Sequence, residues 1–194
     1  MTQIIRFVTN MLPYMLLSLP ILLIVRVVLY SLKKREGVNT NWIHEIGVLF
    51  FCLYLVGLAS QAVIPTRQFR IFPMSINLIP FNKIGETWQI AFLDGHINYL
   101  YIEVFGNIGL FILIGFMLPL LWKRYKNLKN TVLFCFLFSL FFEVSQLFLP
   151  RVTDVDDLIM NTFGGIVGYY LYFRLSVVLK KSKYKRIFVS RPRG

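Results

Sequence analysis

The segment Glu143–Gly168 reads EVSQLFLPRVTDVDDLIMNTFGGIVG and joins two strongly apolar stretches of the chain. Its pattern is E-x-x-Q, then a Pro-Arg turn followed by acidic residues, then N-x-x-G-G-x-x-G. A charged group at the centre of a bilayer costs at least about 2.5 kcal/mol, so helices that face lipid rarely carry carboxylates or amides. Polar groups in the turn and flanks of a helical hairpin therefore indicate that this segment has a function.

The composition of the whole chain is that of a membrane protein. Of its 194 residues, 57% are hydrophobic and only 15% are charged. Apolar runs of about 18 residues or more are long enough to cross a bilayer. Five runs reach this length, and they are Met11–Ser31, Ile43–Ile64, Tyr101–Trp122, Thr131–Leu149 and Leu158–Leu179. The sequence predicts an all-α polytopic membrane protein with about five transmembrane helices, in which residues 1–194 form a single transmembrane domain.

The net charge of +12 comes largely from basic residues in three clusters, at residues 33–35, 123–129 and 180–193. With five spans, all three clusters lie on one side of the membrane, and the positive-inside rule assigns that side to the cytoplasm. The N-terminus and the connections Pro65–Leu100 and Pro150–Asp157 then face outward, and residues 180–194 form a basic cytoplasmic tail. Because topology and contact with anionic lipid account for the charge, no nucleic-acid partner is predicted.

The long outer connection is apolar and contains the segment INLIPF at Ile76–Phe81. Ile84, Trp88, Ala91 and Phe92 fall on one face of a helix, which predicts a short amphipathic helix lying in the membrane interface. Two interpretations of INLIPF stay open. It is either a re-entrant segment that dips into the membrane or caps the helices, or an aromatic-rich interfacial loop.

Polar side chains from four predicted spans fall in the outer half of the bilayer. Their depth follows from the helical rise of about 1.5 Å per residue. The residues are Gln61, Glu103, Asn107, Glu143, Gln146 and Asn161. Glu103 and Asn107 share a helix face through their i, i+4 spacing, and an i, i+3 spacing does the same for Glu143 and Gln146. This convergence predicts a polar site that opens outward.

The outer turn adds Arg151 and three aspartates above this site. Asp154, Asp156 and Asp157 can cap the next helix and match its dipole, or they can hold a divalent cation through oxygen ligands. One acidic cluster without a second set of ligands does not establish a metal site, so no cofactor is predicted. A buried Glu143 must be protonated or paired, and Arg151 is the nearest cation.

The last predicted span carries a stripe of small residues. Asn161, Gly164, Gly165 and Gly168 share one helix face, and the glycines let another helix approach closely. We therefore expect a structural role for the glycines and an inward position for Asn161. Gln146 and Asn161 are either contacts to a ligand or hydrogen-bond partners between helices.

With these residues in view, the chain resembles the VanZ-like family of small bacterial membrane proteins. The similarity rests on INLIPF, on FGNIGLFILIGFMLPLL at Phe105–Leu121 and on Glu143–Gly168, so that the core motifs lie within residues 76–179. In the first block, Asn77 and Pro80 are expected to be structural. One departure is that the turn at residues 150–151 lacks an extra Gly that many relatives carry. The family is named for a protein that lowers susceptibility to the glycopeptide teicoplanin, which implies a role in glycopeptide resistance or cell-envelope homeostasis.

The leading hypothesis is a non-enzymatic or weakly catalytic protein of the bacterial cytoplasmic membrane. Its outward-facing polar pocket recognises a lipid-linked wall precursor or a lipoglycopeptide, and Arg151 suits a phosphate group. The residues expected to bind the ligand are Glu103, Asn107, Glu143, Gln146, Arg151, Asp154, Asp157 and Asn161.

Two alternatives remain. One is an intramembrane enzyme in which Glu143 and an aspartate act as general acid and base, or in which the aspartates hold a metal ion. The other is a proton-coupled carrier that uses Glu103 and Glu143 as relays. Besides the ligand, membrane lipids are the expected partners, and the oligomeric state is left open.

Overall fold

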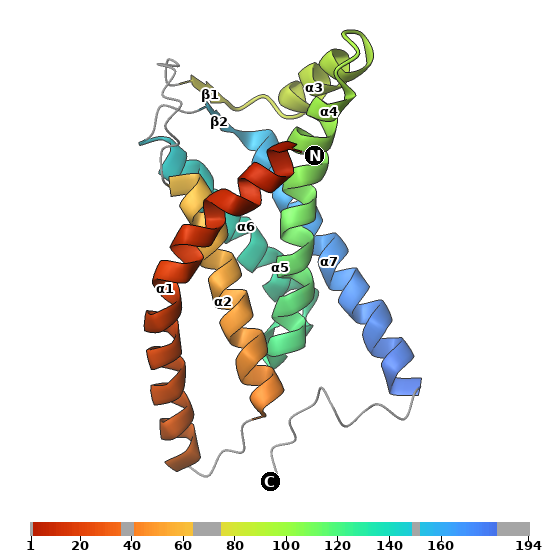
Figure 1. The fold of residues 1–194 in the computed structure, drawn as a ribbon. Helices are drawn as coiled ribbons and strands as arrows, with labels where there is room; N and C mark the ends of the chain where they lie inside the picture. Colours follow the sequence, from red (N-terminus) through yellow and green to blue (C-terminus); the bar gives the residue numbers. More distant parts are fainter. Residues whose placement is uncertain (1, 36–40, 64–74, 149–151, 182–194) are drawn as a thin grey trace. The chain divides into compact units, whose positions relative to one another are not determined.

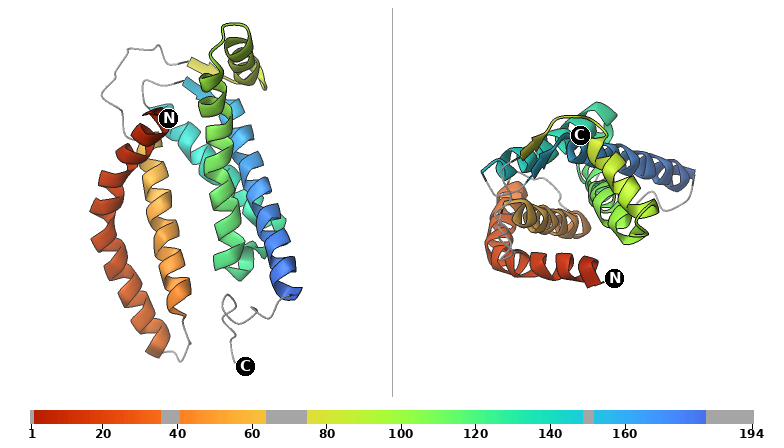
Figure 2. Two further views of the ribbon diagram at one scale, coloured as in Figure 1. Left: turned by 45° about the vertical axis from the view of Figure 1, so that its right-hand side comes forward. Right: turned by 90° about the horizontal axis from the view of Figure 1, so that it is seen from above.

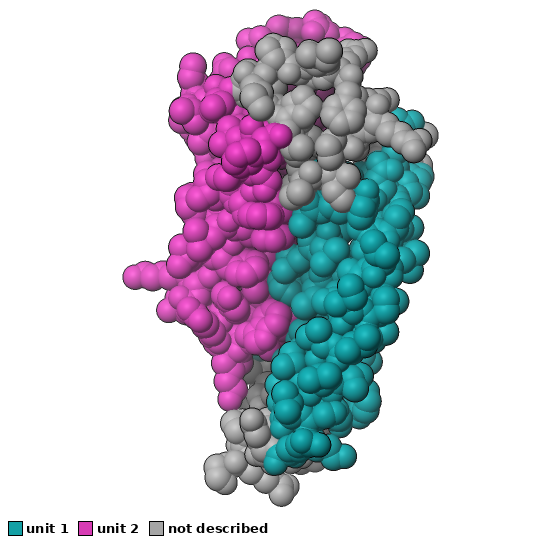
Figure 3. Space-filling model, turned by 90° about the vertical axis from the view of Figure 1, so that its left-hand side faces the viewer, with its two compact units in different colours: residues 1–61, 174–194 teal, residues 62–173 magenta. Residues whose placement is uncertain are grey.

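The computed structural model describes residues 2–35, 41–63, 75–148 and 152–181, most of them in helices (Figure 1). The chain divides into two compact units, which Figure 3 shows in different colours. The first unit contains residues 1–61 and 174–194, and the second contains residues 62–173. The basic tail predicted for residues 180–194 lies almost entirely outside the described residues, and the single domain over the whole chain stays a prediction.

The first unit is built on two long helices, α1 (Thr2–Arg35) and α2 (Trp42–Val63). Arg26 of α1 forms an ion pair with Glu45 of α2, and the Glu45 side chain is only 9% exposed. Breaking a buried pair of this kind leaves one charge without compensation, which is strongly destabilising. The pair therefore holds the two helices in register.

Four helices in the described part of the chain are long and apolar enough to cross a membrane. They cover Ile5–Arg35, Trp42–Gln61, Ile97–Leu121 and Leu128–Gln146. The predicted all-α polytopic membrane fold is confirmed. The fifth predicted span, Leu158–Leu179, lies within α7 (Val155–Lys181), a continuous helix of 27 residues that is not one of these four. Membrane crossing by α7 stays a prediction.

The second unit contains the helices α5 (Asn107–Leu121) and α6 (Leu128–Gln146) together with the first two-thirds of α7. The short helix α4 (Ile97–Leu100) and a π-helical turn (Tyr101–Gly106) lead into α5 without a break. Apolar side chains of α5 and α6 form the core, which includes Phe111, Ile114, Leu118, Cys135 and Phe142. Packing of this core fixes the positions of the helix ends, and the polar residues lie at those ends.

The glycine stripe of α7 packs directly against the backbone of α5 (Figure 2). A Cβ atom at Gly164 would lie 2.3 Å from the carbonyl oxygen of Ile108, and one at Gly168 would lie 2.1 Å from that of Ile112. A Cβ atom at Gly165 would overlap a side chain of α6. No larger residue fits at these positions unless the helices move apart, as expected for helices that pack through small residues.

A short parallel ladder joins the outer connection to the turn before α7. Strand β1 (Ser75–Asn77) pairs with β2 (Val152–Asp154), so that Ile76 lies opposite Thr153. The sequence did not predict this ladder, because three residues are too few to show the alternation that marks a strand. The ladder brings INLIPF beside the start of α7.

The apolar side chains of INLIPF are not buried by the protein. The exposed fractions of Leu78, Ile79 and Phe81 are 72%, 67% and 64%. Non-helical backbone inside the hydrocarbon region is tolerated only where protein buries it or where it lines a wet cavity. Whether INLIPF is an interfacial loop or a re-entrant segment stays open.

The amphipathic helix predicted after INLIPF is present as α3 (Asn82–Phe92). The four residues predicted for its apolar face divide between two surfaces. Ala91 is buried, whereas Trp88 and Phe92 are exposed. Periodicity alone could not separate these residues, because both protein and lipid cover apolar side chains in a membrane protein.

Candidate functional site

Polar side chains from several elements meet at the end of the second unit that carries the β1–β2 ladder and α3, two features that Figure 1 labels. They are joined by hydrogen bonds and ion pairs, and we call them the polar cluster. Its members are Asn77, Lys83, Glu103, Asn107, Glu143, Asp154, Asp156 and Asp157.

Asp156 caps the N-terminus of α3. Its fully buried carboxylate accepts the backbone N–H of Phe81 at 2.5 Å and that of Ile84 at 3.1 Å. Phe81 has φ 67° and ψ 5°, a left-handed conformation that bulky residues rarely adopt. The two hydrogen bonds hold this unfavoured turn, so a residue at the start of α7 determines how α3 begins.

Asp154 connects the ladder to α7. It is buried, accepts hydrogen bonds from the Asn77 amide at 3.3 Å and from the backbone N–H of Asp156 at 3.0 Å, and so caps its own helix. Asn77 in turn accepts the N–H of Ile79 at 3.2 Å and shapes the turn after β1. Capping by aspartate and asparagine side chains is the ordinary use of these residues at helix starts and turns.

The Glu143 side chain accepts a hydrogen bond from a backbone N–H group within the cluster. Its Oε2 atom accepts the N–H of Asp154 at 3.0 Å, and its carbonyl oxygen accepts the hydroxyl of Thr153 at 3.4 Å. The last turn of α6 is therefore tied to β2. The cation predicted to pair with Glu143, Arg151, lies outside the described residues.

Within the described part of the chain, Lys83 is the cation of the cluster, and no pattern in the sequence indicated this role. Its Nζ atom lies 2.8 and 2.9 Å from the two carboxylate oxygens of Asp157 and 3.4 Å from Oε2 of Glu103. Burial acts to lower the pKa of Lys83, but the two carboxylates outweigh it and raise the pKa above the ordinary lysine value. Lys83 is therefore charged throughout the physiological pH range.

Asn107 completes the contacts around this ion pair. Its Nδ2 atom donates to Oδ1 of Asp157 and to the carbonyl oxygen of Glu103, both at 2.9 Å. The second bond joins residues four apart on the same helical segment and reaches the backbone of Glu103, not its carboxylate. One carboxylate, that of Asp157, thus receives donors from both α3 and α5.

The remaining predicted site residues lie outside this network. Asn161 lies one turn deeper than Asp157 and donates to Oγ of Ser139 at 2.9 Å, while its own Oδ1 atom is buried without a protein partner. Gln146 is half-buried at the end of α6, and within the described ranges no hydrogen bond joins it to the cluster. Pro80 is exposed in the turn before α3, and Gln61 belongs to the first unit.

The three aspartates already have donors from the protein. Asp154 and Asp156 act as caps, and Asp157 binds Lys83 and Asn107. Among the residues that the structure describes, no group of three or more His, Cys, Asp or Glu side chains is arranged to hold a metal ion. A divalent cation at the aspartates would compete with these donors for the carboxylate oxygens.

The charge balance of the cluster limits what it can bind. Among the residues that the structure describes, it brings together five carboxylic acid side chains, at residues 103, 143, 154, 156 and 157, with one ammonium group, that of Lys83. An acceptor-rich arrangement of this kind suits hydrogen-bond donors and cations.

Comparison with known proteins agrees with the three sequence blocks. A model of the VanZ/LLP1 family matches residues 46–179, a range that includes the whole polar cluster. The chain is similar to protein VanZ of Enterococcus faecium, with 29% identity over 122 residues that cover 62% of this chain and 66% of that relative. No solved structure matches the chain. Because the family model covers more than half of the sequence, the chain belongs to the VanZ/LLP1 family.

Proposed function

We propose that the protein contributes to resistance against glycopeptides and lipoglycopeptides of the teicoplanin type, or to cell-envelope homeostasis, by binding a lipid-linked or acylated ligand at the polar cluster. Family membership supports this proposal, because the family model spans residues 46–179, a range that includes every residue of the cluster. The proposed ligand is either a lipid-linked wall precursor or the lipoglycopeptide itself.

The observation that carries the proposal is the acceptor-rich cluster beside an exposed apolar surface. The carboxylates of the cluster complement amide N–H and ammonium groups, which the peptide parts of both ligands present. The exposed side chains of INLIPF and α3 lie at the same end of the second unit and suit an acyl or polyprenyl chain. Either ligand therefore combines a peptide part that donates hydrogen bonds with an apolar chain.

The proposed site faces outward from the bacterial cytoplasmic membrane, with the N-terminus outside and the C-terminus in the cytoplasm. The 3₁₀ turn Lys123–Lys126 carries three basic residues and joins α5 to α6 at the ends opposite the cluster. Positive charge collects on the cytoplasmic side of membrane proteins. A cytoplasmic 3₁₀ turn puts the cluster near the outer surface.

The proposal is tested by antibiotic susceptibility of cells with and without the chain, using glycopeptides that have or lack an acyl tail. We expect protection against the acylated compounds, and we expect Glu143→Gln to abolish it at unchanged protein levels in the membrane. Glu86→Gln is the matched control, because Glu86 is an exposed residue of α3 outside the cluster. Equal protection against both classes would contradict binding of the lipid tail, and full protection by Glu143→Gln would exclude a role for this carboxylate.

A further inference from the structure

The helix α3 presents three different surfaces. One faces the other elements of the second unit and contains Lys83, Thr87 and Ala91, spaced four residues apart. Thr87 and Ala91 are 1% and 3% exposed, and α3 contacts α4 and the π-helical turn. This face fixes the helix to the protein and carries the lysine of the polar cluster.

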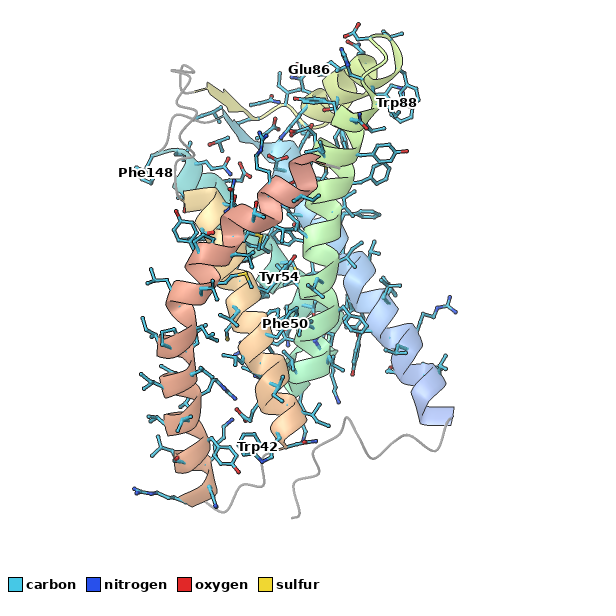
Figure 4. The ribbon with its side chains drawn as sticks, in the orientation of Figure 1. Trp42, Phe50, Tyr54, Glu86, Trp88 and Phe148 are labelled. Carbon is cyan, nitrogen blue, oxygen red and sulfur yellow. The ribbon has the colours of Figure 1, made fainter. Side chains whose placement is uncertain are left out.

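The two other surfaces of α3 differ sharply in polarity. Phe81, Trp88 and Phe92 form an exposed apolar flank, and the rings of Trp88 and Phe92 lie 4.4 Å apart. On the other flank, Asn82 donates to Glu86 at 3.0 Å. Figure 4 shows Glu86 and Trp88 on different sides of the helix. A helix that lies along a membrane surface has this combination of a polar and an apolar side.

Exposed apolar side chains also occur on the segment after α3 and on the membrane-spanning helix that follows it. Leu93, Ile97, Tyr101 and Phe105 are exposed and lead from the end of α3 along the span Ile97–Leu121. The rings of Tyr101 and Phe105 lie 5.8 Å apart. Aromatic side chains gather at the ends of spans, at the level of the lipid headgroups. Lipid that covers this span would therefore reach the flank of α3 as well.

We propose that α3 lies in the membrane interface and docks on lipid through the flank formed by Phe81, Trp88 and Phe92. The partner is the boundary between headgroups and acyl chains, and the flank bearing Glu86 faces water. Since Lys83 on the inner face binds Asp157 and Glu103, this docking sets the polar cluster at headgroup depth. The inference concerns the resting protein and does not require the ligand proposed above.

Tryptophan fluorescence of the full chain in phosphatidylcholine vesicles tests this placement. The chain has three tryptophans, and the variant Trp42→Phe/Trp122→Phe leaves Trp88 alone. We expect lipids brominated near the headgroup end of the acyl chain to quench Trp88 several-fold more than lipids brominated near the terminal methyl. Aqueous iodide should quench Trp88 several-fold less than free tryptophan. The control carries Glu86→Trp with all three native tryptophans replaced by Phe, and iodide should quench it strongly.

Two results would overturn the proposal. If iodide quenches Trp88 as strongly as the tryptophan of the Glu86→Trp control, the flank faces water. If neither iodide nor brominated lipid quenches Trp88, protein covers the flank, whether from a second copy or from another chain. A second reporter, Phe92→Trp with the native tryptophans replaced, should behave like Trp88 and guards against a local effect of one variant. Antibiotic susceptibility plays no part in these measurements, so their failure is distinct from failure of the proposed function.

Discussion

Asp156 accepts the backbone N–H of Phe81, a residue 75 positions earlier in the chain, and so caps the helix that Phe81 begins. A cap usually comes from the same segment as its helix. In this protein the cap comes from the start of another helix, and the left-handed turn at Phe81 depends on it. The position of α3 therefore depends on the residues at the start of α7 as much as on the sequence of α3 itself.

Replacing Asp156 by Ala should loosen α3. The change leaves two backbone N–H groups without an acceptor, which we expect to lower the free energy of unfolding by about 1–3 kcal/mol. Hydrogen exchange should speed up at the amides of Phe81 and Ile84. Asp94→Ala, at an exposed acidic residue after α3, is the control and should leave exchange unchanged. Equal exchange in both variants would show that the cap does not hold the turn.

Lys83 and Asp157 should be energetically coupled. Lys83→Met leaves two carboxylates without their cation, but because the lysine side chain is 22% exposed, the loss of stability should stay below the about 3–5 kcal/mol of a fully buried pair. Asp157→Asn in the same chain should recover part of that loss. Thermal unfolding of both single variants and the double variant measures the coupling, and strictly additive losses would argue against it.

The raised pKa of Lys83 gives the same pair a pH dependence of known sign. A cation whose pKa is higher in the folded state contributes full stability below its unfolded pKa, which is about 10.4 for lysine. That contribution is lost only as the pH rises through the raised, folded value. The difference in melting temperature between the wild type and Lys83→Met should therefore shrink in strong alkali, as the pH rises through the folded pKa of Lys83.

Two glycines offer a matched test of the helix packing. A Cβ atom at Gly165 would lie 2.5 Å from Sγ of Cys135, whereas no heavy atom lies within 4 Å of a Cβ atom at Gly109. Overpacking typically costs about 1–3 kcal/mol, so Gly165→Ala should unfold at a lower temperature or denaturant concentration. Gly109→Ala should be neutral or more stable by up to about 1 kcal/mol, through helix propensity. Similar behaviour of the two variants would contradict the close packing.

The proposed orientation is checked by labelling with an impermeant thiol reagent. Cysteines are placed at Thr153, in β2, and at Asn127, beside the basic 3₁₀ turn, in a background with Cys52→Ala and Cys135→Ala. We expect labelling of intact cells at residue 153 and not at residue 127, with both positions labelled after the membrane is made permeable. The reverse labelling pattern would show that the topology is opposite to the one proposed.

The features that follow from local spacing were predictable from the sequence. Apolar runs identified the membrane fold, and the i, i+4 spacing placed Glu103 and Asn107 on one helical segment, where Asn107 bonds to the carbonyl oxygen of Glu103. Lys83 was missed because its partner Asp157 lies 74 residues away, and no local pattern joins the two. A lysine on an amphipathic helix is ordinarily solvated, so its sequence context gave no signal. Only the fold shows that it faces two acids.

The aspartates show the same limit. Their sequence context allowed capping or metal binding, and the choice depends on which backbone donors reach them in the fold. Asp156 meets N–H groups from α3, which the spacing within the D-x-D-D run does not encode. For Trp88 and Phe92, periodicity identified an apolar stripe but not whether protein or lipid covers it.

The parallel pairing of β1 with β2 has a consequence for how the protein is made. Parallel strands cannot be joined by a tight hairpin, and here the partners Asn77 and Asp154 enclose α3 to α6 between them. During synthesis, β1 leaves the ribosome long before its partner exists. Closing so long a loop is slow, and the cluster is assembled only after both intervening spans have been inserted. A nascent chain that stops short of Val152 lacks β2 and the aspartates, however well its earlier helices have entered the membrane.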